Sequence, residues 1–138
     1  MFNFTRKVPI TYHSFVYLKK NYENKNALIA MMAKDLSAFV RENLEIFAKY
    51  EKVKVYYDNG QHEISTILNV SLNSFLVNVD FIKVLPVNYK LFQVADLICT
   101  IELLNEKMKA KRLSKSEINF FTTEEMKTYI RRIKTKRI

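Results

Sequence analysis

The chain has 138 residues, of which 49% are apolar and 27% charged, and its formal net charge is +9. This length supplies one domain's worth of hydrophobic core, so we expect a single domain over residues 1–138. The single glycine, Gly60, excludes the glycine-rich phosphate loops of P-loop and dinucleotide-binding proteins. Cys99, His13 and His62 are too few for a disulfide or a closed Cys/His zinc site. This cysteine usage suits a reducing compartment and predicts a cytoplasmic protein.

The basic residues gather toward the C-terminal end of the sequence. Residues 107–138 contain eleven Lys or Arg and three Glu, a net charge of +8, and the rest of the chain is nearly neutral. Such a region could follow the phosphate backbone of a nucleic acid. A solvated surface helix packed by one apolar stripe would show the same pattern, so both interpretations stay open. The candidate phosphate contacts are Arg131, Arg132, Lys134, Lys136 and Arg137.

The first part of the chain alternates strand and helix patterns. Residues 8–18 are rich in β-branched and aromatic types, which predicts a strand. Residues 27–50 carry apolar side chains at spacings of three, four and eight, which predicts a long amphipathic helix. Residues 53–57 predict a second strand that ends at Asp58, followed by a tight turn in which Gly60 supplies a left-handed conformation.

The segment after Gly60 fits two structures. Asn-Gly after a strand is typical of a hairpin. The apolar residues of 64–76, however, follow helical spacing, which favours a strand, a turn and then a helix. Residues 79–84 alternate apolar and charged side chains before a proline and predict a third strand.

The last part of the chain is predicted to be helical. Residues 91–111 predict a long helix, and 114–117 a turn. The Thr-Thr-Glu-Glu run at 122–125 is typical of a helix start and predicts a basic helix that reaches Lys136. Three strands alternating with helices indicate an α/β fold with parallel pairing. No membrane partner is expected, because the longest apolar stretch, 91–104, is too short to cross a bilayer.

Asp58 and Asp96 are the candidate carboxylates of a site for Mg²⁺ or Mn²⁺. Every residue between Lys90 and Glu102 is apolar or neutral except Asp96. We therefore expect a helix buried on nearly all sides, in which Asp96 is paired, metal-bound or protonated. Gln93 lies one turn before Asp96 on the same helix face. Asp58 ends a strand at the sheet edge where α/β proteins gather functional groups.

Each candidate also has a structural interpretation. Asp58 begins an Asp-Asn-Gly sequence that is favoured in turns. The alternative for Asp96 is a structural acid paired with Lys or Arg, in which case Asp96→Asn would lower the free energy of unfolding by up to ~3–5 kcal/mol. Cys99 is expected to be an inert thiol in the core. His13 and His62 are expected to be surface or satisfied core residues.

Three segments carry a resemblance to a known family. They are Val55-Tyr-Tyr-Asp-Asn-Gly-Gln, Asn88-Tyr-Lys-Leu-Phe-Gln-Val-Ala-Asp-Leu-Ile-Cys, and Leu113-Ser-Lys-Ser-Glu before Phe120-Phe121. With them the chain resembles, over essentially its whole length, the C-terminal part of the domain-of-unknown-function family thirty-eight hundred. Gln-x-Ala-Asp-Leu is the most recognisable element. The resemblance implies a ribonuclease H-like fold and a nuclease-type site in which Asp58 and Asp96 hold Mg²⁺ or Mn²⁺ and Gln93 orients the site or substrate.

The chain also departs from that family. Members usually open with a strand carrying Asp-Glu-Ser, which supplies the first metal-binding carboxylate, and this chain has no such triplet. We therefore expect a truncated form or a separately encoded C-terminal piece, with weak metal binding and slow or absent phosphodiester cleavage. On the first long helix, Asp35, Glu42 and Glu45 are the candidate acids to complete the site, and helical spacing does not choose among them.

The missing strand leads to the alternative function. It would leave open sheet edges between the strands at 8–18 and 53–57, and such edges invite another chain. A homodimer, or a partner chain that completes the sheet, is therefore expected. The first function to be weighed is a nuclease-type domain acting on nucleic acid, and the second is a non-catalytic interaction module that pairs through its sheet edge. A third is a basic nucleic-acid binder without catalysis, which predicts salt-sensitive binding that neither Asp58→Asn nor Asp96→Asn changes.

Overall fold

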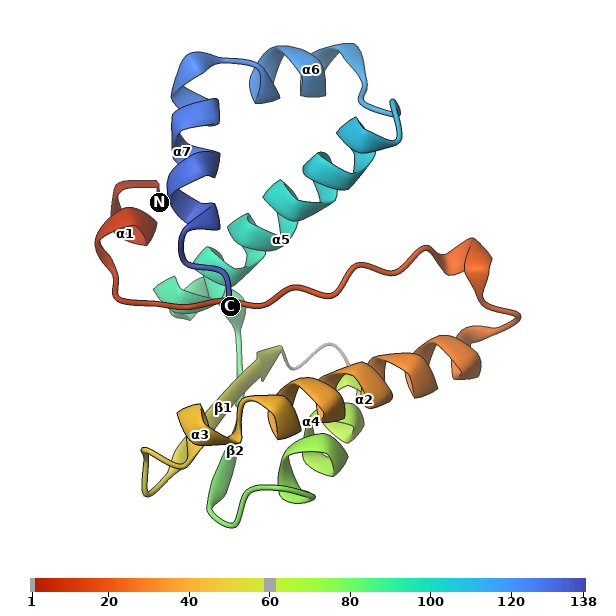
Figure 1. Ribbon diagram of the computed structural model, residues 1–138, viewed down its shortest axis with the longest axis vertical. Helices are drawn as coiled ribbons and strands as arrows, with labels where there is room; N and C mark the ends of the chain where they lie inside the picture. The colour runs from red at the N-terminus through yellow and green to blue at the C-terminus, as the bar shows by residue number, and fades with distance from the viewer. Residues whose placement is uncertain (1, 59–61) are drawn as a thin grey trace. The chain divides into compact units, whose positions relative to one another are not determined.

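The computed structural model describes residues 2–58 and 62–138, which form two compact units (Figure 1). Unit 1 contains the residues up to Val16 together with Lys90–Ile138, and unit 2 is Tyr17–Tyr89. The structure is 62% helical with two parallel strands, which confirms the mixed α/β class. The single domain expected over residues 1–138 stays a prediction.

The elements divide between the two units. Those of unit 1 are α1 (Phe2–Lys7), α5 (Lys90–Lys109), α6 (Lys115–Phe121) and α7 (Glu124–Lys134). Those of unit 2 are η1 (Lys19–Asn21), α2 (Lys25–Glu42), α3 (Leu44–Phe47), β1 (Val53–Asp58), α4 (His62–Asn73), β2 (Val79–Val84) and η2 (Pro86–Asn88). No helix of the described residues is long and apolar enough to cross a membrane.

Unit 2 is built on the succession β1, α4, β2. The two strands pair in parallel, from Val53 opposite Val79 to Asp58 opposite Val84. Parallel strands need a crossover connection, and α4 is part of it. The helix expected after Gly60 is therefore confirmed and the hairpin alternative is wrong. The left-handed turn predicted at Gly60 itself lies outside the described residues.

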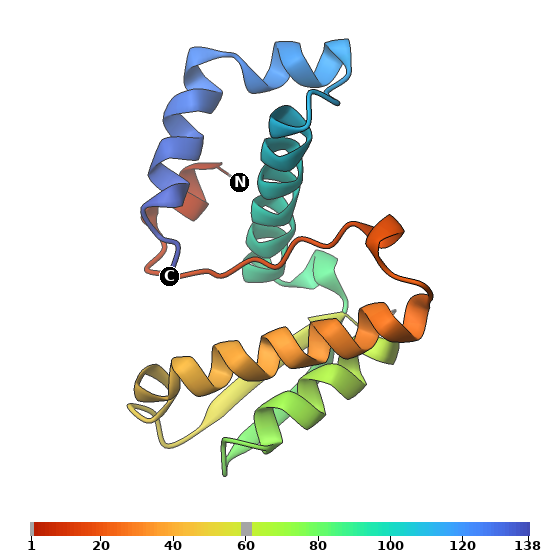
Figure 2. The same cartoon turned by 45° about the vertical axis from the view of Figure 1, so that its right-hand side comes forward.

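Helices α2 and α4 run side by side within unit 2 (Figures 1 and 2). Their contact buries the side chains of Val40, Ile67 and Leu72. Ser71 is fully buried there, and its hydroxyl donates a hydrogen bond to the carbonyl of Ala33 (3.2 Å). This hydrogen bond gives the buried Ser71 hydroxyl a partner, and buried polar groups in proteins generally have one.

The long helix predicted at 27–50 is shorter than expected. Asn24 caps the start of α2 by accepting a hydrogen bond from the Ala27 amide (2.9 Å). The helix ends at Asn43, whose side-chain amide donates to the carbonyl of Phe39 (2.8 Å). Asparagine favours such local bonds over helix continuation, and α3 follows as a separate short helix.

The strand predicted at 8–18 is wrong. This segment makes only an isolated bridge, between Tyr12 and Arg137, and the sheet of the described residues has two strands rather than three. Part of the segment is nevertheless buried, since Tyr12 belongs to the core of unit 1 and Ile10 packs against that core. β-Branched and aromatic residues suit a half-buried extended segment, whether or not a strand lies beside it. A homodimer or a completing partner strand stays a prediction.

Unit 1 is a helical unit whose core lies between α5, α6 and α7. Buried side chains from all three helices form one cluster with Tyr12. The turn predicted at 114–117 is wrong, because Ser114 and Glu117 form a capping box that starts α6. Bonds from Lys107 and then from Ser114 lower the pKa of Glu117 to about 2. The basic helix predicted after 122–125 is confirmed as α7, which is capped by Thr123.

Candidate nucleic-acid interface

The residues proposed for the metal site lie in different units. Asp58 is the last residue of β1 in unit 2, whereas Gln93 and Asp96 belong to α5 in unit 1. Within the described ranges 2–58 and 62–138, no three His, Cys, Asp or Glu side chains form a group that could hold a metal ion. Neither unit alone therefore supplies the expected ligand set.

Among the described residues of unit 2, the acids of the first long helix do not form a metal-binding group with other His, Cys, Asp or Glu side chains. Asp35 accepts a hydrogen bond from the hydroxyl of Tyr17 (2.9 Å). Burial and this bond raise the pKa of Tyr17. Glu42 and Glu45 are exposed. Asp35 thus has a structural role in the attachment of the segment before η1.

The burial expected for Asp96 is wrong, because α5 is buried on one face only. Val94, Ile98 and Ile101 are buried, and Asp96 is exposed. At about 100° per residue, Asp96 lies about 200° around the helix from Val94. Although α5 has apolar or neutral residues around most of its circumference, only one of its faces is buried. An exposed carboxylate keeps its hydration and needs no partner.

The expectation for Cys99 is also partly wrong. Cys99 is exposed rather than part of the core. Partial burial of its thiol, with the negative charges of Asp96 and Glu102, nevertheless raises the pKa of this group. The thiol form is therefore favoured at neutral pH, and the side chain is expected to be unreactive. His13 and His62 are both at the surface.

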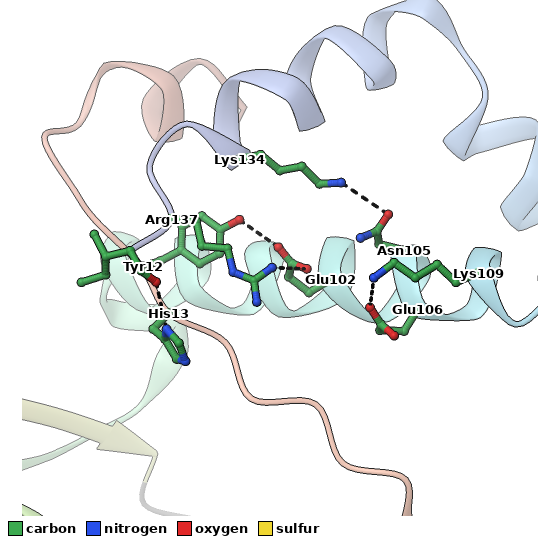
Figure 3. Close-up of polar contacts among 9 residues, drawn as sticks. Tyr12, His13, Glu102, Asn105, Glu106, Lys109, Lys134 and Arg137 are labelled. Carbon is green, nitrogen blue, oxygen red and sulfur yellow. Dashed lines mark hydrogen bonds and ion pairs between the residues drawn. The ribbon is translucent and has the colours of Figure 1, made fainter. Parts of the chain in front are cut away.

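The buried acid of α5 is Glu102, which is 3% exposed. It accepts a hydrogen bond from the hydroxyl of Tyr12 (2.8 Å), and Arg137 Nη1 lies 3.7 Å from its other oxygen (Figure 3). Tyr12 also pairs through its backbone, donating to the Lys136 carbonyl and accepting from the Ile138 amide, each at 3.0 Å. One carboxylate thus joins the N-terminal segment, α5 and the C-terminal end.

The positive charge of the protein is concentrated in unit 1. This unit has 14 Lys or Arg and six Asp or Glu, a net charge of +8, whereas unit 2 has nine and eight, a net charge of +1. Four of the six acids already have cationic partners within the unit. These pairs are Arg137–Glu102, Lys109–Glu106, Lys107–Glu117 and Lys127–Glu124. The remaining cations therefore give a surplus of positive charge.

The five predicted phosphate contacts have different surroundings. Arg131, Arg132 and Lys134 are exposed on α7 and form no ion pair with any described residue. Lys136 donates a hydrogen bond to the carbonyl of Val8 (2.7 Å). Arg137 is the partner of Glu102. Lys134 also donates a long hydrogen bond to Asn105 of α5 (3.5 Å; Figure 3). Arg131, Arg132 and Lys134 are thus exposed and without a described acidic partner, whereas Lys134, Lys136 and Arg137 each make a contact within the unit.

Sequence reasoning missed Arg6. It lies on α1, and with Tyr129 and Arg132 it lines two pockets of unit 1, of about 620 and 410 Å³. Only the packing of α1 against α7 brings Arg6 to the basic helix. The available signal was the Arg6-Lys7 pair in an otherwise uncharged N-terminal segment, which a count of the C-terminal charges does not include.

No family model, curated protein or solved structure matches this chain. The resemblance of its segments to the family thirty-eight hundred therefore stays a prediction, and the function must be argued from the residues of the two units.

The assignment of Glu102 as the structural acid predicts unequal effects of two matched substitutions. Glu102→Ala removes a buried acceptor and leaves Tyr12 and Arg137 without their partner. We expect it to lower the free energy of unfolding by about 2–3 kcal/mol. Asp96→Ala on the exposed face should change it by less than about 0.5 kcal/mol. Urea denaturation followed by circular dichroism measures both, and an equal loss in the two variants would refute the assignment.

The same contact predicts a loss of stability at high pH. Burial and the bond to Glu102 raise the pKa of Tyr12 to about 12, from 10.0. The folded state therefore favours the protonated phenol, and this contribution is complete below pH 10 and lost as the pH rises through 12. It amounts to at most about 2–3 kcal/mol. Burial also raises the pKa of Tyr17 and Tyr129, so the wild type should lose stability beyond this amount.

Urea denaturation at pH 9 and pH 11 tests this prediction. Tyr12→Phe should show a smaller loss between the two pH values than the wild type. Tyr50→Phe, at an exposed position, is the matched control and should behave as the wild type. An unchanged loss in Tyr12→Phe would show that the phenol of Tyr12 does not titrate as described.

Proposed function

We propose that the protein binds nucleic acid through the basic surface of unit 1. The observation that carries this proposal is the segregation of charge, with a net +8 on unit 1 and +1 on unit 2. Binding to a polyanion releases the counterions condensed on it, which favours a surface with a surplus of cations. Arg131, Arg132 and Lys134 are the central contacts, because they are exposed and have no described acidic partner.

The helix that carries these cations is held firmly. Met126, Tyr129, Ile130 and Ile133 bury one face of α7 in the core of unit 1. The charged residues occupy the rest of its circumference, as in an amphipathic helix. A fixed backbone lowers the entropy lost when side chains are ordered on a ligand. This arrangement supports binding of phosphates without specifying a base sequence.

Salt-dependent binding to a short single-stranded oligonucleotide tests the proposal. Arg131→Gln with Lys134→Gln should weaken binding and reduce the slope of log K against log salt by about 1.4, or about 0.7 per contact. Arg41→Gln with Lys34→Gln removes the same two residue types from exposed positions of unit 2 and should change neither quantity. Fluorescence anisotropy from 50 to 200 mM KCl measures the affinities. Equal effects of the two double variants, or no salt-dependent binding, would overturn the proposal.

The nuclease-type function is the second candidate. One observation favours it: Asp58 ends β1 at the carboxyl edge of a parallel strand pair, where ligands of α/β proteins are usually bound. Carboxylate and amide oxygens such as those of Asp58, Asp96 and Gln93 suit Mg²⁺ or Mn²⁺. The ribonuclease H-like fold belongs to this candidate. The nuclease-type function has less support than nucleic-acid binding without catalysis, because neither unit brings together three His, Cys, Asp or Glu side chains among its described residues.

Thermal unfolding with millimolar Mn²⁺ tests this second candidate. A metal that binds only the folded state raises the unfolding temperature, by about 1–3 °C for weak binding. The rise should be absent in Asp58→Asn and in Asp96→Asn. It should persist in Asp80→Asn, which changes an acid of β2 that forms an ion pair with Lys52. A wild type without any rise, or a rise kept by all three variants, would refute a metal site at these residues.

A further inference from the structure

Two pockets of unit 1 share a wall formed by Arg6, Tyr129 and Arg132. The smaller pocket, of about 410 Å³, is completed by residues at the C-terminal end of α7, including Lys136. The larger, of about 620 Å³, extends toward the start of α7 and includes Phe120. Both lie within a single unit, between α1 and α7, and the shared residues make them neighbouring parts of one surface.

The smaller pocket has the charge of a phosphate site. Its three cations are Arg6, Arg132 and Lys136, and none of its described lining residues is acidic. The planar guanidinium of arginine matches the spacing of phosphate oxygens and can donate two hydrogen bonds at once. Lys136 uses one of its three donors on the Val8 carbonyl (2.7 Å), so two remain for an anion.

The wall of this pocket is fixed by buried neighbours. Tyr129 belongs to the core, and Thr5, one residue before Arg6, is fully buried. Burial raises the pKa of Tyr129, and an interaction with the Thr5 side chain lowers it, which indicates that the two side chains lie close together. Contacts of this kind hold α1 against α7. Arg6 is thereby positioned beside Arg132 before any ligand arrives, as an effective binding site requires.

The larger pocket has a different chemical character. Two carboxylates, Glu124 and Glu125, line it and disfavour a second phosphate. Phe120 offers an aromatic surface, and Asn3 and Thr128 offer polar groups beside it. A flat, neutral group with polar edges suits these walls, and a nucleobase is such a group. The two pockets together fit one phosphate joined to one nucleoside.

We infer that this pair of pockets binds a nucleoside monophosphate group, with the phosphate against Arg6, Arg132 and Lys136 and the base in the larger pocket. The inference rests on the proposed function and deepens it, because the natural source of such a group is the phosphorylated end of a nucleic acid strand. A free nucleoside monophosphate carries the same chemistry and is the other source.

Oligonucleotides that differ only at their ends test the inference. Single strands with an internal fluorescein carry a 5′-phosphate, a 3′-phosphate or two hydroxyl ends, and anisotropy at 100 mM KCl gives their affinities. We expect one phosphorylated strand to bind about tenfold more tightly than the hydroxyl strand. Arg6→Gln should abolish this preference and keep most of the binding to the hydroxyl strand. Arg132→Gln should also abolish the preference, and it should weaken binding to the hydroxyl strand as well, because Arg132 is one of the central contacts of the proposed function. Both residues are exposed, and thermal unfolding confirms that the variants fold.

Arg131→Gln is the matched control, since Arg131 lies outside both pockets on the same helix. It should weaken all strands equally and keep the preference for a phosphorylated end. Competition with adenosine monophosphate and with inorganic phosphate separates the two sources. Displacement by the free nucleotide below millimolar concentration would identify it as a ligand in its own right, whereas a preference seen only with strands identifies the strand end.

The outcomes distinguish this inference from the proposed function. If the hydroxyl strand shows no salt-dependent binding, the proposed function fails. If that strand binds but phosphorylation of either end has no effect and the free nucleotide does not compete, the pocket assignment fails alone. A preference that survives in both Arg6→Gln and Arg132→Gln would also overturn the assignment, because the phosphate would then be bound elsewhere.

Discussion

The burial of one carboxylate organises unit 1. Glu102 lies in the core face of α5, and an unpartnered charge there would cost several kcal/mol. Tyr12 and Arg137 satisfy it from opposite ends of the chain. Tyr12 and Arg137 also form an isolated backbone bridge with each other. The extended N-terminal segment and the end of the sequence are therefore both held beside α5. The apolar cluster of α5, α6 and α7 then packs beside these contacts, and Tyr12 belongs to both.

The contacts of Glu102 with Tyr12 and Arg137 explain how residues far apart in the sequence form one basic pocket. The segment from α1 to Tyr12 is fixed at Tyr12 by Glu102 and at Val8 by Lys136. It is therefore held close to α7, and Arg6 reaches the side of α7 that carries Arg132. Some basic residues of the C-terminal region thus stabilise the fold while others remain open to a ligand. Lys136 takes part in both, because an ammonium group has more donors than one carbonyl can use.

Local patterns predicted several elements, and tertiary contacts decided the others. β1, α4, β2 and α7 follow from spacing, β propensity and capping signals, which act over a few residues. The segment 8–18 has the composition of a strand, but a strand needs a neighbouring strand, and among the described residues this segment forms a single bridge, between Tyr12 and Arg137. The helix at 91–111 was recognised correctly, yet its composition did not show which face is covered. For this reason Asp96 was expected to be buried and Glu102 was overlooked.

The candidate interface, like the fold, could be predicted from the sequence only in part. The cations of α7 are visible in the sequence because they cluster within one segment. The wall completed by Arg6 depends on long-range packing and has no local signal. Charge explains why this part of the structure, rather than the β1–α4–β2 unit, is the better candidate for a polyanion. In unit 2 nine cations are nearly balanced by eight acids, whereas in unit 1 fourteen cations face six acids, four of which already have a cationic partner.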